Sequence, residues 1–372
     1  MIGFITRKPA TDTTVWSGTT SFIYKAVCDK YDNVVNIIIP RLLLHKLANY
    51  FIRLITFNKV KFSFVDVFFT YIEIKIKQKK ISKCEMVFCV AQSELIGNGA
   101  FRFQGKIIHI SDATYHLMLN YYFKNVPVCE QRILDKLELN ALRKADYIFL
   151  ASTWARDDAV RHYKISKSKV FVDLFGANLP DEFNGYHNKT NNIIKLLLVG
   201  VDWSRKGVDT AIKVVDKLNS MRLNFTFCLT VVGVTVSEGK LEQFRKRNIF
   251  FAGKINKDSQ KGLDRLSNIY RCNDIFILPT KAECAGIVFC EASMYGLPSL
   301  TYATGGVPSY VEDGYNGYLL DPSLSEDSFV EKILFLIQDN HLFDLQISSR
   351  RKYENSLNWK HWIDVVSSIV DV

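Results

Sequence analysis

The sequence has no run of uncharged apolar residues long enough to cross a bilayer. A spanning helix needs about 18 or more such residues, and the nearest candidate, residues 62–74, contains Asp66 and Glu73. The apolar run at residues 1–7 is too short for a signal peptide and suits a buried strand. We therefore expect a cytoplasmic protein.

Cysteine is present but lacks the spacing of a metal site or a disulfide framework. None of the eight cysteines forms a Cys-x-x-Cys pair, and no His-x-x-x-His accompanies them. Most lie within apolar runs, as Cys89 and Cys228 do. This pattern predicts reduced, buried thiols and argues against a structural zinc site.

Acidic residues are under-represented in the first half of the chain. Residues 1–185 hold 26 Lys and Arg against 17 Asp and Glu, a net charge of +9, while the remainder holds 22 against 21 and adds only +1 to the total of +10. An anionic partner of the first half would explain this asymmetry: a membrane surface, a lipid diphosphate or a nucleic acid. A general surplus that keeps the protein soluble explains it equally well.

Short apolar segments alternate with amphipathic segments along the whole chain. Segments of this kind predict buried strands of parallel sheets with helices between them. The expected strands are residues 34–39, 86–90, 106–110, 147–151 and 169–172 in the first half, and 195–200, 226–232, 249–251, 275–278 and 298–302 in the second. Because 372 residues are too many for one ordinary core, we expect two tandem α/β domains. The turn-rich residues 176–191 predict the boundary.

A predicted helix in the first half carries an apolar stripe. Six apolar residues within residues 42–58 fall on one helical face, beside Lys46 and Arg53. They are Leu43, Leu47, Tyr50, Phe51, Leu54 and Ile55. Residues 75–83 then form a basic run. Both segments suit the surface of an anionic membrane; the alternative is a core helix followed by a solvated helix end.

Residues 279–298 contain the most chemical information. An apolar strand ends at Leu278, a loop passes through Glu283, and a helix begins near Gly286 and ends at Gly296. The loop therefore lies at the carboxyl end of a parallel strand, which is where doubly wound folds bind ligands.

The first turn of this helix predicts an anion-binding site. The backbone N–H groups of Gly286, Ile287 and Val288 have no acceptor within the helix, so they are available to phosphate or sugar oxygens. Glu283 lies just before the helix and Glu291 about one turn into it. Carboxylates suit sugar hydroxyls better than a phosphate, so we expect both to bind sugar.

Glu283 and Glu291 are separated by seven residues, which resembles the E-x7-E motif of retaining GT-B glycosyltransferases. The flanking sequence resembles glycosyltransferase family 4, the glycosyl transferases group 1. The similarity extends, in the family's order, to residues 199–207, 304–308 and 312–317. This resemblance covers the second domain.

The resemblance implies a GT-B architecture for the whole chain. It consists of two tandem Rossmann-like domains with an interdomain cleft and a C-terminal helix that crosses back to the first domain. We expect an acceptor-side domain at residues 1–178, a nucleotide-sugar-binding domain at residues 190–345, and the returning helix within residues 346–372.

The resemblance also implies roles for four residues. Glu283 is expected to bind hydroxyls of the donor sugar, and Glu291 to bind the ribose. Arg205 and Lys206 are expected to neutralise the diphosphate, because preorganised cations stabilise the charge that develops on a leaving group. The sequence lacks the Asp-x-Asp pair that holds a divalent metal in GT-A enzymes. We therefore predict no metal and no cofactor.

Other site residues are assigned on fewer matches. Lys254 and Ile255 resemble the segment whose backbone meets the nucleobase. Residues 14–20 occupy the place of a glycine-rich turn near the donor phosphates, but they contain a single glycine, Gly18. Asp112 lies where the family carries a His or Asp near the reaction centre, and the alternative for it is a helix cap. We expect Glu138 and Asp146, by contrast, to be surface charges.

These features predict a retaining glycosyltransferase that uses a nucleotide diphosphate sugar and a glycan or lipid-linked acceptor. The expected setting is bacterial surface polysaccharide assembly, with peripheral contact at the inner face of the membrane. Asp112, Arg205, Lys206 and Glu283 are the expected catalytic residues. The alternatives are a GT-B nucleotide-sugar epimerase or phosphorylase, and a non-catalytic sugar-nucleotide-binding partner subunit. A nucleic-acid partner would explain the charge but none of the motifs, so none is expected.

Overall fold

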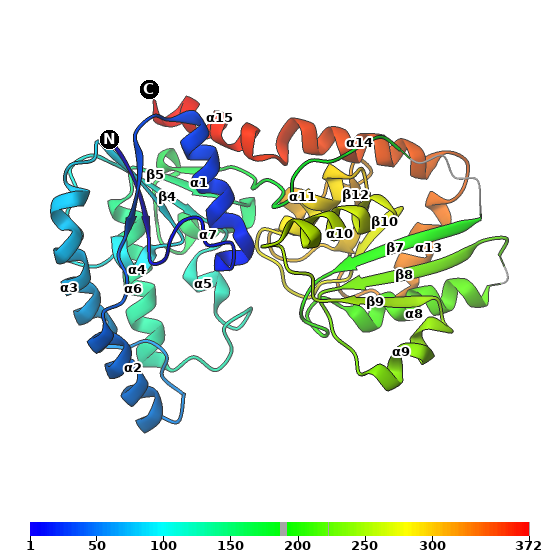
Figure 1. The fold of residues 1–372 in the computed structure, drawn as a ribbon, viewed down its shortest axis with the longest axis horizontal. Helices are drawn as coiled ribbons and strands as arrows, with labels where there is room; N and C mark the ends of the chain where they lie inside the picture. The colour runs from blue at the N-terminus through cyan, green and yellow to red at the C-terminus, as the bar shows by residue number, and fades with distance from the viewer. Residues whose placement is uncertain (187–191, 222, 372) are drawn as a thin grey trace. The chain divides into compact units, whose positions relative to one another are not determined.

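The computed structural model describes residues 1–186, 192–221 and 223–371, which divide into two units (Figure 1). The first unit comprises Met1–Asp173 and the residues from Ile363 on, and the second comprises Leu174–Trp362. Each unit contains a six-stranded sheet whose neighbouring strands are all parallel. The expected architecture of two parallel α/β sheets is confirmed.

The first sheet has the strand order β2-β1-β3-β4-β5-β6. Its strands are β1 (Ile2–Thr6), β2 (Val34–Ile38), β3 (Met86–Val90), β4 (Lys106–Ser111), β5 (Tyr147–Leu150) and β6 (Val170–Val172). Every residue of β1 is buried, because helices cover both faces of a parallel sheet, and this burial explains the continuous apolar run. The carboxyl ends of β1 and β4 lie on the same edge of the sheet, so the loops that follow them meet there.

The helices of the first unit connect these strands. They are α1 (Thr19–Lys30), α2 (Leu43–Ile55), α3 (Phe64–Ile81), α4 (Ser93–Ile96), α5 (Tyr115–Met118), α6 (Val128–Lys144) and α7 (Thr153–Arg161), with the 3-10 helices η1 (Val15–Gly18) and η2 (Lys167–Lys169). Ile74 and Ile81 of α3 and Leu142 of α6 share a buried core with residues of the sheet such as Ile5. The helix α2 contributes no residue to this core.

The second sheet has the strand order β12-β11-β10-β7-β8-β9. Its strands are β7 (Ile193–Val199), β8 (Thr226–Val232), β9 (Ile249–Gly253), β10 (Ile275–Leu278), β11 (Ser299–Tyr302) and β12 (Gly317–Leu320). The chain changes direction across the sheet between β7 and β10, which are neighbours in space but not in sequence. Such a switch point is where doubly wound sheets bind ligands.

The helices of the second unit bring side chains to that switch point. They are α8 (Val208–Ser220), α9 (Glu238–Arg245), α10 (Gln260–Arg271), α11 (Ile287–Met294), α12 (Val307–Tyr310), α13 (Asp327–Leu336) and α14 (His341–Ser356). The helix α8 follows β7 and α11 follows β10, so both N-termini lie at the carboxyl edge of the sheet.

The terminal helix α15 (Trp359–Val370) begins in the second unit and ends in the first. In the first unit, Lys106 Nζ donates to the carbonyl of Val370 at 2.6 Å, and Lys30 Nζ lies 3.1 Å from Asp364 Oδ1. Of the segment that we expected to return to the first domain, only the residues from Ile363 on belong to the first unit. The preceding helix α14, which lies within the expected returning segment, belongs to the second unit.

The cysteines only partly follow the sequence-based expectation. All eight are free thiols, but Cys28, Cys129 and Cys272 are exposed rather than buried. Within the described ranges, no helix combines the length and the hydropathy needed to cross a membrane.

Candidate active site

Two cations and one carboxylate meet where β7 and β10 end. Lys206 Nζ pairs with Glu283 Oε2, and the guanidinium of Arg205 lies 3.8 Å from the same oxygen. Arg205 Nη1 also donates to the carbonyl of Ala282 at 3.0 Å. Lys206 and Glu283 are largely buried, with 8% and 13% of their side chains exposed. The structure therefore brings together three of the four residues that we expected to be catalytic.

The turn after β7 is shaped to hold Lys206 in this position. A Cβ atom at Gly200 would lie 2.6 Å from Lys206 Cγ, so only glycine lets the lysine stem pass. The turn is tied to the loop after β10, because Lys281 N donates to the carbonyl of Arg205 at 2.8 Å. Both loops are thereby fixed relative to one another, which limits the movement of the charged groups that they carry.

The N-terminus of α11 lies next to Glu283 in the chain. Gly286 is the N-cap residue and has a positive φ of 59°, which glycine adopts without strain. A Cβ atom there would also lie 2.5 Å from the ring of Phe289. No side chain caps this helix, and the N–H group of Phe289 donates to the carbonyl of Gly286 at 2.8 Å. The first-turn N–H groups that suit a ligand are therefore those of Ile287 and Val288.

Glu291 lies deeper in the same helix and is fully buried. Its Oε1 accepts from Lys257 Nζ at 2.7 Å, and its Oε2 accepts from the Tyr270 hydroxyl at 2.8 Å. Burial, followed by the charge of Glu291, raises the pKa of Tyr270 well above its usual value, so the phenol keeps its proton and donates it. Both oxygens of the Glu291 carboxylate are thus paired.

The loop between β9 and α10 carries Lys257 as well as the expected nucleobase segment. Lys254 is exposed and Ile255 half-buried, directly after Gly253, whose φ is 68°. This loop therefore approaches Glu291 through Lys257. Sequence reasoning missed both Lys257 and Tyr270. No motif marks them, because each reaches the site from an element other than the one that carries the E-x7-E pair.

In the first unit the structure brings Asp112 to the loop of residues 14–20. Trp16 Nε1 donates to Asp112 Oδ2 at 3.3 Å, which joins the loop after β1 to the loop after β4. Trp16, Ser17 and Gly18 all have positive φ angles, of 51°, 56° and 86°. Two of these residues are not glycine, so the turn is strained. The sequence singled out Gly18 in this loop, whereas the residue that donates to Asp112 is Trp16.

A polar network surrounds the loop that follows Asp112. His116 Nδ1 lies 2.7 Å from Asp158 Oδ1, and Asp158 also accepts from the Thr114 hydroxyl. The His116 ring stacks on His162 with 3.6 Å between ring centroids. This network fixes the backbone directly after Asp112.

Glu138 is not the surface charge that we expected. It is buried, and burial raises its pKa to about 7, with the nearby carboxylates adding to the effect. Its position four residues after Leu134 and three before Ala141 places it on the inward face of α6. Asp146 is exposed, as expected, and it accepts a hydrogen bond from the backbone N–H of Ile107 at 2.8 Å.

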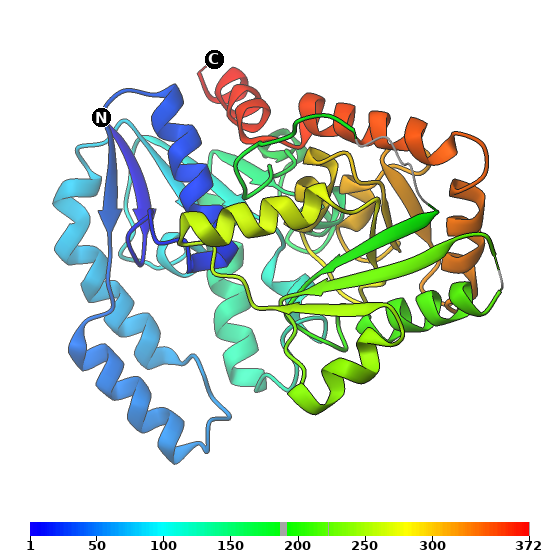
Figure 2. The same ribbon diagram turned by 45° about the vertical axis from the view of Figure 1, so that its right-hand side comes forward.

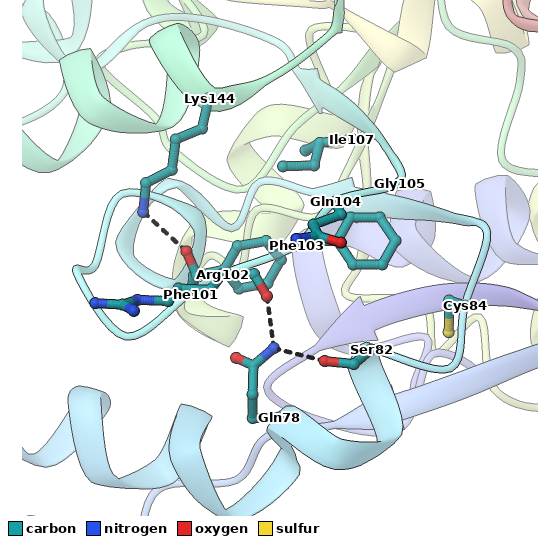
Figure 3. A pocket seen from close by; sticks show the side chains of 10 residues that line it. All are labelled: Gln78, Ser82, Cys84, Phe101, Arg102, Phe103, Gln104, Gly105, Ile107 and Lys144. Carbon is teal, nitrogen blue, oxygen red and sulfur yellow. Dashed lines mark hydrogen bonds between the residues drawn. The ribbon is translucent and has the colours of Figure 1, made fainter.

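A cavity of about 690 Å³ lies elsewhere, near the amino ends of β3 and β4 (Figure 3). Lys144 Nζ donates there to the carbonyls of Ile96, Asn98 and Phe101, and burial lowers its pKa. Gln78 Nε2 donates to the carbonyl of Arg102. The polar groups that line the cavity are engaged in hydrogen bonds to the backbone of the loop before β4. We therefore assign these groups a structural role, and we do not assign the cavity as a ligand site.

Residues 181–356 match the family described as Glycosyl transferases group 1. The second unit therefore contains a segment that is similar to the glycosyl transferases group 1, which we call the group 1 domain. This domain contains the Arg205–Lys206–Glu283 cluster and Glu291. The resemblance to the glycosyl transferases group 1 is therefore confirmed over this domain.

Two relatives illustrate the similarity of the group 1 domain to known glycosyltransferases. The lipopolysaccharide glucosyltransferase WaaG of Escherichia coli K12 is 33% identical over 188 residues, which are 47% of this chain and 48% of that protein. The sulfoquinovosyl transferase SQD2 of Arabidopsis thaliana is 27% identical over 172 residues, which are 45% of this chain and 31% of that protein. The chain spans between about a third and two thirds of the length of the first curated relatives that it matches.

The solved structures show the fold of the complete chain. The structure of HepE of Anabaena, which was determined in complex with UDP, has a TM-score of 0.67 and 13% identity, and the match covers 100% of this chain and 99% of that one. The structure of WaaG has a TM-score of 0.64 and 16% identity, with the same two shares covered. The group 1 domain and the preceding unit therefore share the GT-B fold of these glycosyltransferases.

Proposed function

We propose that the protein is a retaining, metal-independent glycosyltransferase. It moves a sugar from a nucleotide diphosphate sugar to a glycan or glycolipid acceptor in bacterial surface polysaccharide assembly. The observation that carries the proposal is the convergence of Arg205 and Lys206 on Glu283, beside the uncapped N-terminus of α11. The lipopolysaccharide transferase among the relatives supports the choice of acceptor class.

The proposed chemistry follows from the charges at this edge of the second sheet. Arg205, Lys206 and the first turn of α11 bind the diphosphate and stabilise the negative charge that grows on its leaving oxygen. Glu283, held by Lys206, accepts hydrogen bonds from hydroxyls of the donor sugar. The bond from the anomeric carbon to the diphosphate oxygen breaks, and the acceptor oxygen bonds to the same face of the sugar. The proton of the acceptor hydroxyl goes to the departing diphosphate oxygen.

The first prediction tests this proposal with a panel of nucleotide diphosphate sugars. We expect acceptor-dependent release of a nucleoside diphosphate from one of them, undiminished by EDTA, because protein cations neutralise the diphosphate. NMR of the product should show the anomeric configuration of the donor. Complete loss of turnover in EDTA that Mg2+ or Mn2+ restores would refute metal independence, and an acceptor-independent change of the donor would favour the epimerase alternative.

The second prediction concerns Asp112, which we propose faces the donor sugar and the acceptor. Asp112→Asn keeps the size of the side chain but removes its charge, so we expect turnover to fall by about 100-fold, comparable to the loss of one preorganised electrostatic contact. Nucleoside diphosphate affinity should not change, since the domain that binds it is intact. The exposed Asp29→Asn serves as the matched control. If the Asp112 variant turns over as fast as the wild type, the proposed role at the donor sugar is wrong. Asp112 would then serve only as the hydrogen-bond acceptor of Trp16.

The membrane contact that we propose for this enzyme is peripheral. The net charge of +9 in residues 1–185 suits attraction to anionic lipids.

A further inference from the structure

The helix α2 has its polar side inward and its apolar side outward. The buried residues of α2 are His45 and Asn49. Its large apolar side chains are exposed instead, with 72% of Leu43 and 74% of Ile55 accessible to solvent. A surface helix of a soluble domain normally turns its apolar stripe to the core. The apolar side chains of residues 42–58 thus share one face of α2, as predicted. That face is exposed, so α2 is not the core helix of the alternative interpretation.

A polar network fixes α2 in this orientation against α3. The two ring nitrogens of His45 lie 2.8 Å from Glu73 Oε1 and 3.1 Å from Asp66 Oδ1. Asn49 Nδ2 donates to the same oxygen of Asp66 at 2.6 Å, and Arg7 Nη1 donates to Glu73 Oε2 at 2.6 Å. Turning the apolar stripe inward would leave these buried polar groups without partners, which is costly. The exposed stripe is therefore a stable feature of the fold.

The exposed apolar residues continue past α2 into the connecting loop and the start of α3. Phe57 is 87% exposed and Phe64 is 76% exposed. Figures 1 and 2 both show α2 alongside α3. We define the outer apolar surface as Leu43, Leu47, Phe51, Leu54, Phe57 and Phe64. Large apolar side chains exposed in such number on two adjoining helices mark an interaction site.

The exposed charges of the segment that carries the outer apolar surface are of one sign. Residues 42–75 contain two acidic residues, Asp66 and Glu73, and both are buried in the network with His45. The five basic residues of the same segment are all exposed: Lys46, Arg53, Lys59, Lys61 and Lys75. A second copy of the chain would bring like charges together at such a surface. An anionic lipid surface would neutralise them and also accept the apolar side chains.

We propose that the outer apolar surface inserts into the interface of an anionic bilayer, with α2 lying along the membrane. Leu47, Phe51 and Leu54 enter the boundary between headgroups and acyl chains. Lys46 and Arg53, beside the stripe, extend their charged ends to the lipid phosphates. The inference deepens the proposed function, on which it rests only for the choice of a membrane-bound acceptor. The sequence suggested that residues 42–58 and 75–83 lie together on an anionic membrane. Insertion of the α2 stripe adds to this a contact that persists when salt screens the charges.

The third prediction tests insertion by flotation of the full chain with vesicles of phosphatidylglycerol and phosphatidylethanolamine. We expect the wild type to float with these vesicles and to bind phosphatidylcholine vesicles much more weakly. The triple variant Leu47→Ser, Phe51→Ser and Leu54→Ser should bind the anionic vesicles at least about 100-fold more weakly. Three apolar side chains are then no longer available to transfer from water into the bilayer. Part of the wild-type binding should survive high salt.

Controls separate this proposal from misfolding and from the proposed function. Val128→Ser removes an exposed apolar side chain of the same unit outside the surface, and it should float like the wild type. The triple variant should keep the wild-type Tm and the affinity for nucleoside diphosphates, since its altered residues are exposed and lie in the other unit. Equal flotation of the triple variant, or no flotation of the wild type, would overturn the proposal. So would a wild-type dimer in sedimentation analysis that the triple variant abolishes.

Discussion

Replacing Lys206 with Ala is expected to lower turnover by about 100-fold or more, with a much smaller effect on the affinity for a nucleoside diphosphate. The ammonium group is largely buried beside Glu283 and next to Arg205, where little water screens its charge. A cation in this position stabilises the leaving diphosphate more strongly as its charge grows. An interaction that strengthens towards the transition state affects kcat more than binding. Steady-state release of the nucleoside diphosphate measures the effect.

Lys206→Ala also removes the partner of a largely buried carboxylate, so a loss of stability has to be separated from a loss of chemistry. The double variant Lys206→Ala, Glu283→Gln no longer contains the unpaired charge, and its Tm should recover towards that of the wild type. Its turnover should not recover. Lys213→Ala, an exposed lysine on α8, is the matched control. Recovery of turnover in the double variant would assign Lys206 to the support of Glu283 and not to the leaving group.

The second unit could be predicted largely from the sequence because its signals are local. Each strand is a short apolar run, and the loop and helix that hold Glu283, Gly286 and Glu291 are consecutive in the chain. No local pattern in the sequence indicates that Arg205 and Lys206 lie near this loop, and only the family resemblance predicted that they do. The structure then supplied the physical link, since Lys206 pairs directly with Glu283.

What the sequence could not show depends on contacts between distant segments. Trp16 meets Asp112 across 96 positions, and Lys257 meets Glu291 across 34, so no local pattern marks either pair. Glu138 was misjudged because a charged residue on a helix is usually exposed. The direction of the α2 stripe was open for a related reason: a helical pattern shows which residues share a face, whereas His45, Asp66 and Glu73 decide which way that face points.

Replacing Glu291 with Ala is expected to weaken the binding of a nucleoside diphosphate by about 10-fold or more, the value of one charged hydrogen-bond pair. We propose that this carboxylate binds the ribose hydroxyls. In the structure, Lys257 Nζ donates to Oε1 and the Tyr270 hydroxyl donates to Oε2. The Lys257 side chain is 34% exposed, whereas Tyr270 is fully buried. Lys257 is therefore the partner that can leave, so Oε1 is the oxygen that becomes available to the ribose.

This difference between the two partners makes the prediction specific. Isothermal titration calorimetry should show that Lys257→Ala binds a nucleoside diphosphate as tightly as the wild type or more tightly, because nothing then competes for Oε1. Glu291→Ala should bind more weakly, and the exposed Glu331→Ala should not differ from the wild type. A Tm measured for each variant identifies any loss that comes from unfolding, since Tyr270 loses its acceptor when Glu291 is removed. Unchanged affinity in a folded Glu291→Ala variant would rule out the ribose assignment. If Lys257→Ala instead weakens binding as much as Glu291→Ala does, then Lys257 contacts the nucleotide itself, and the pair acts as one unit in the bound state.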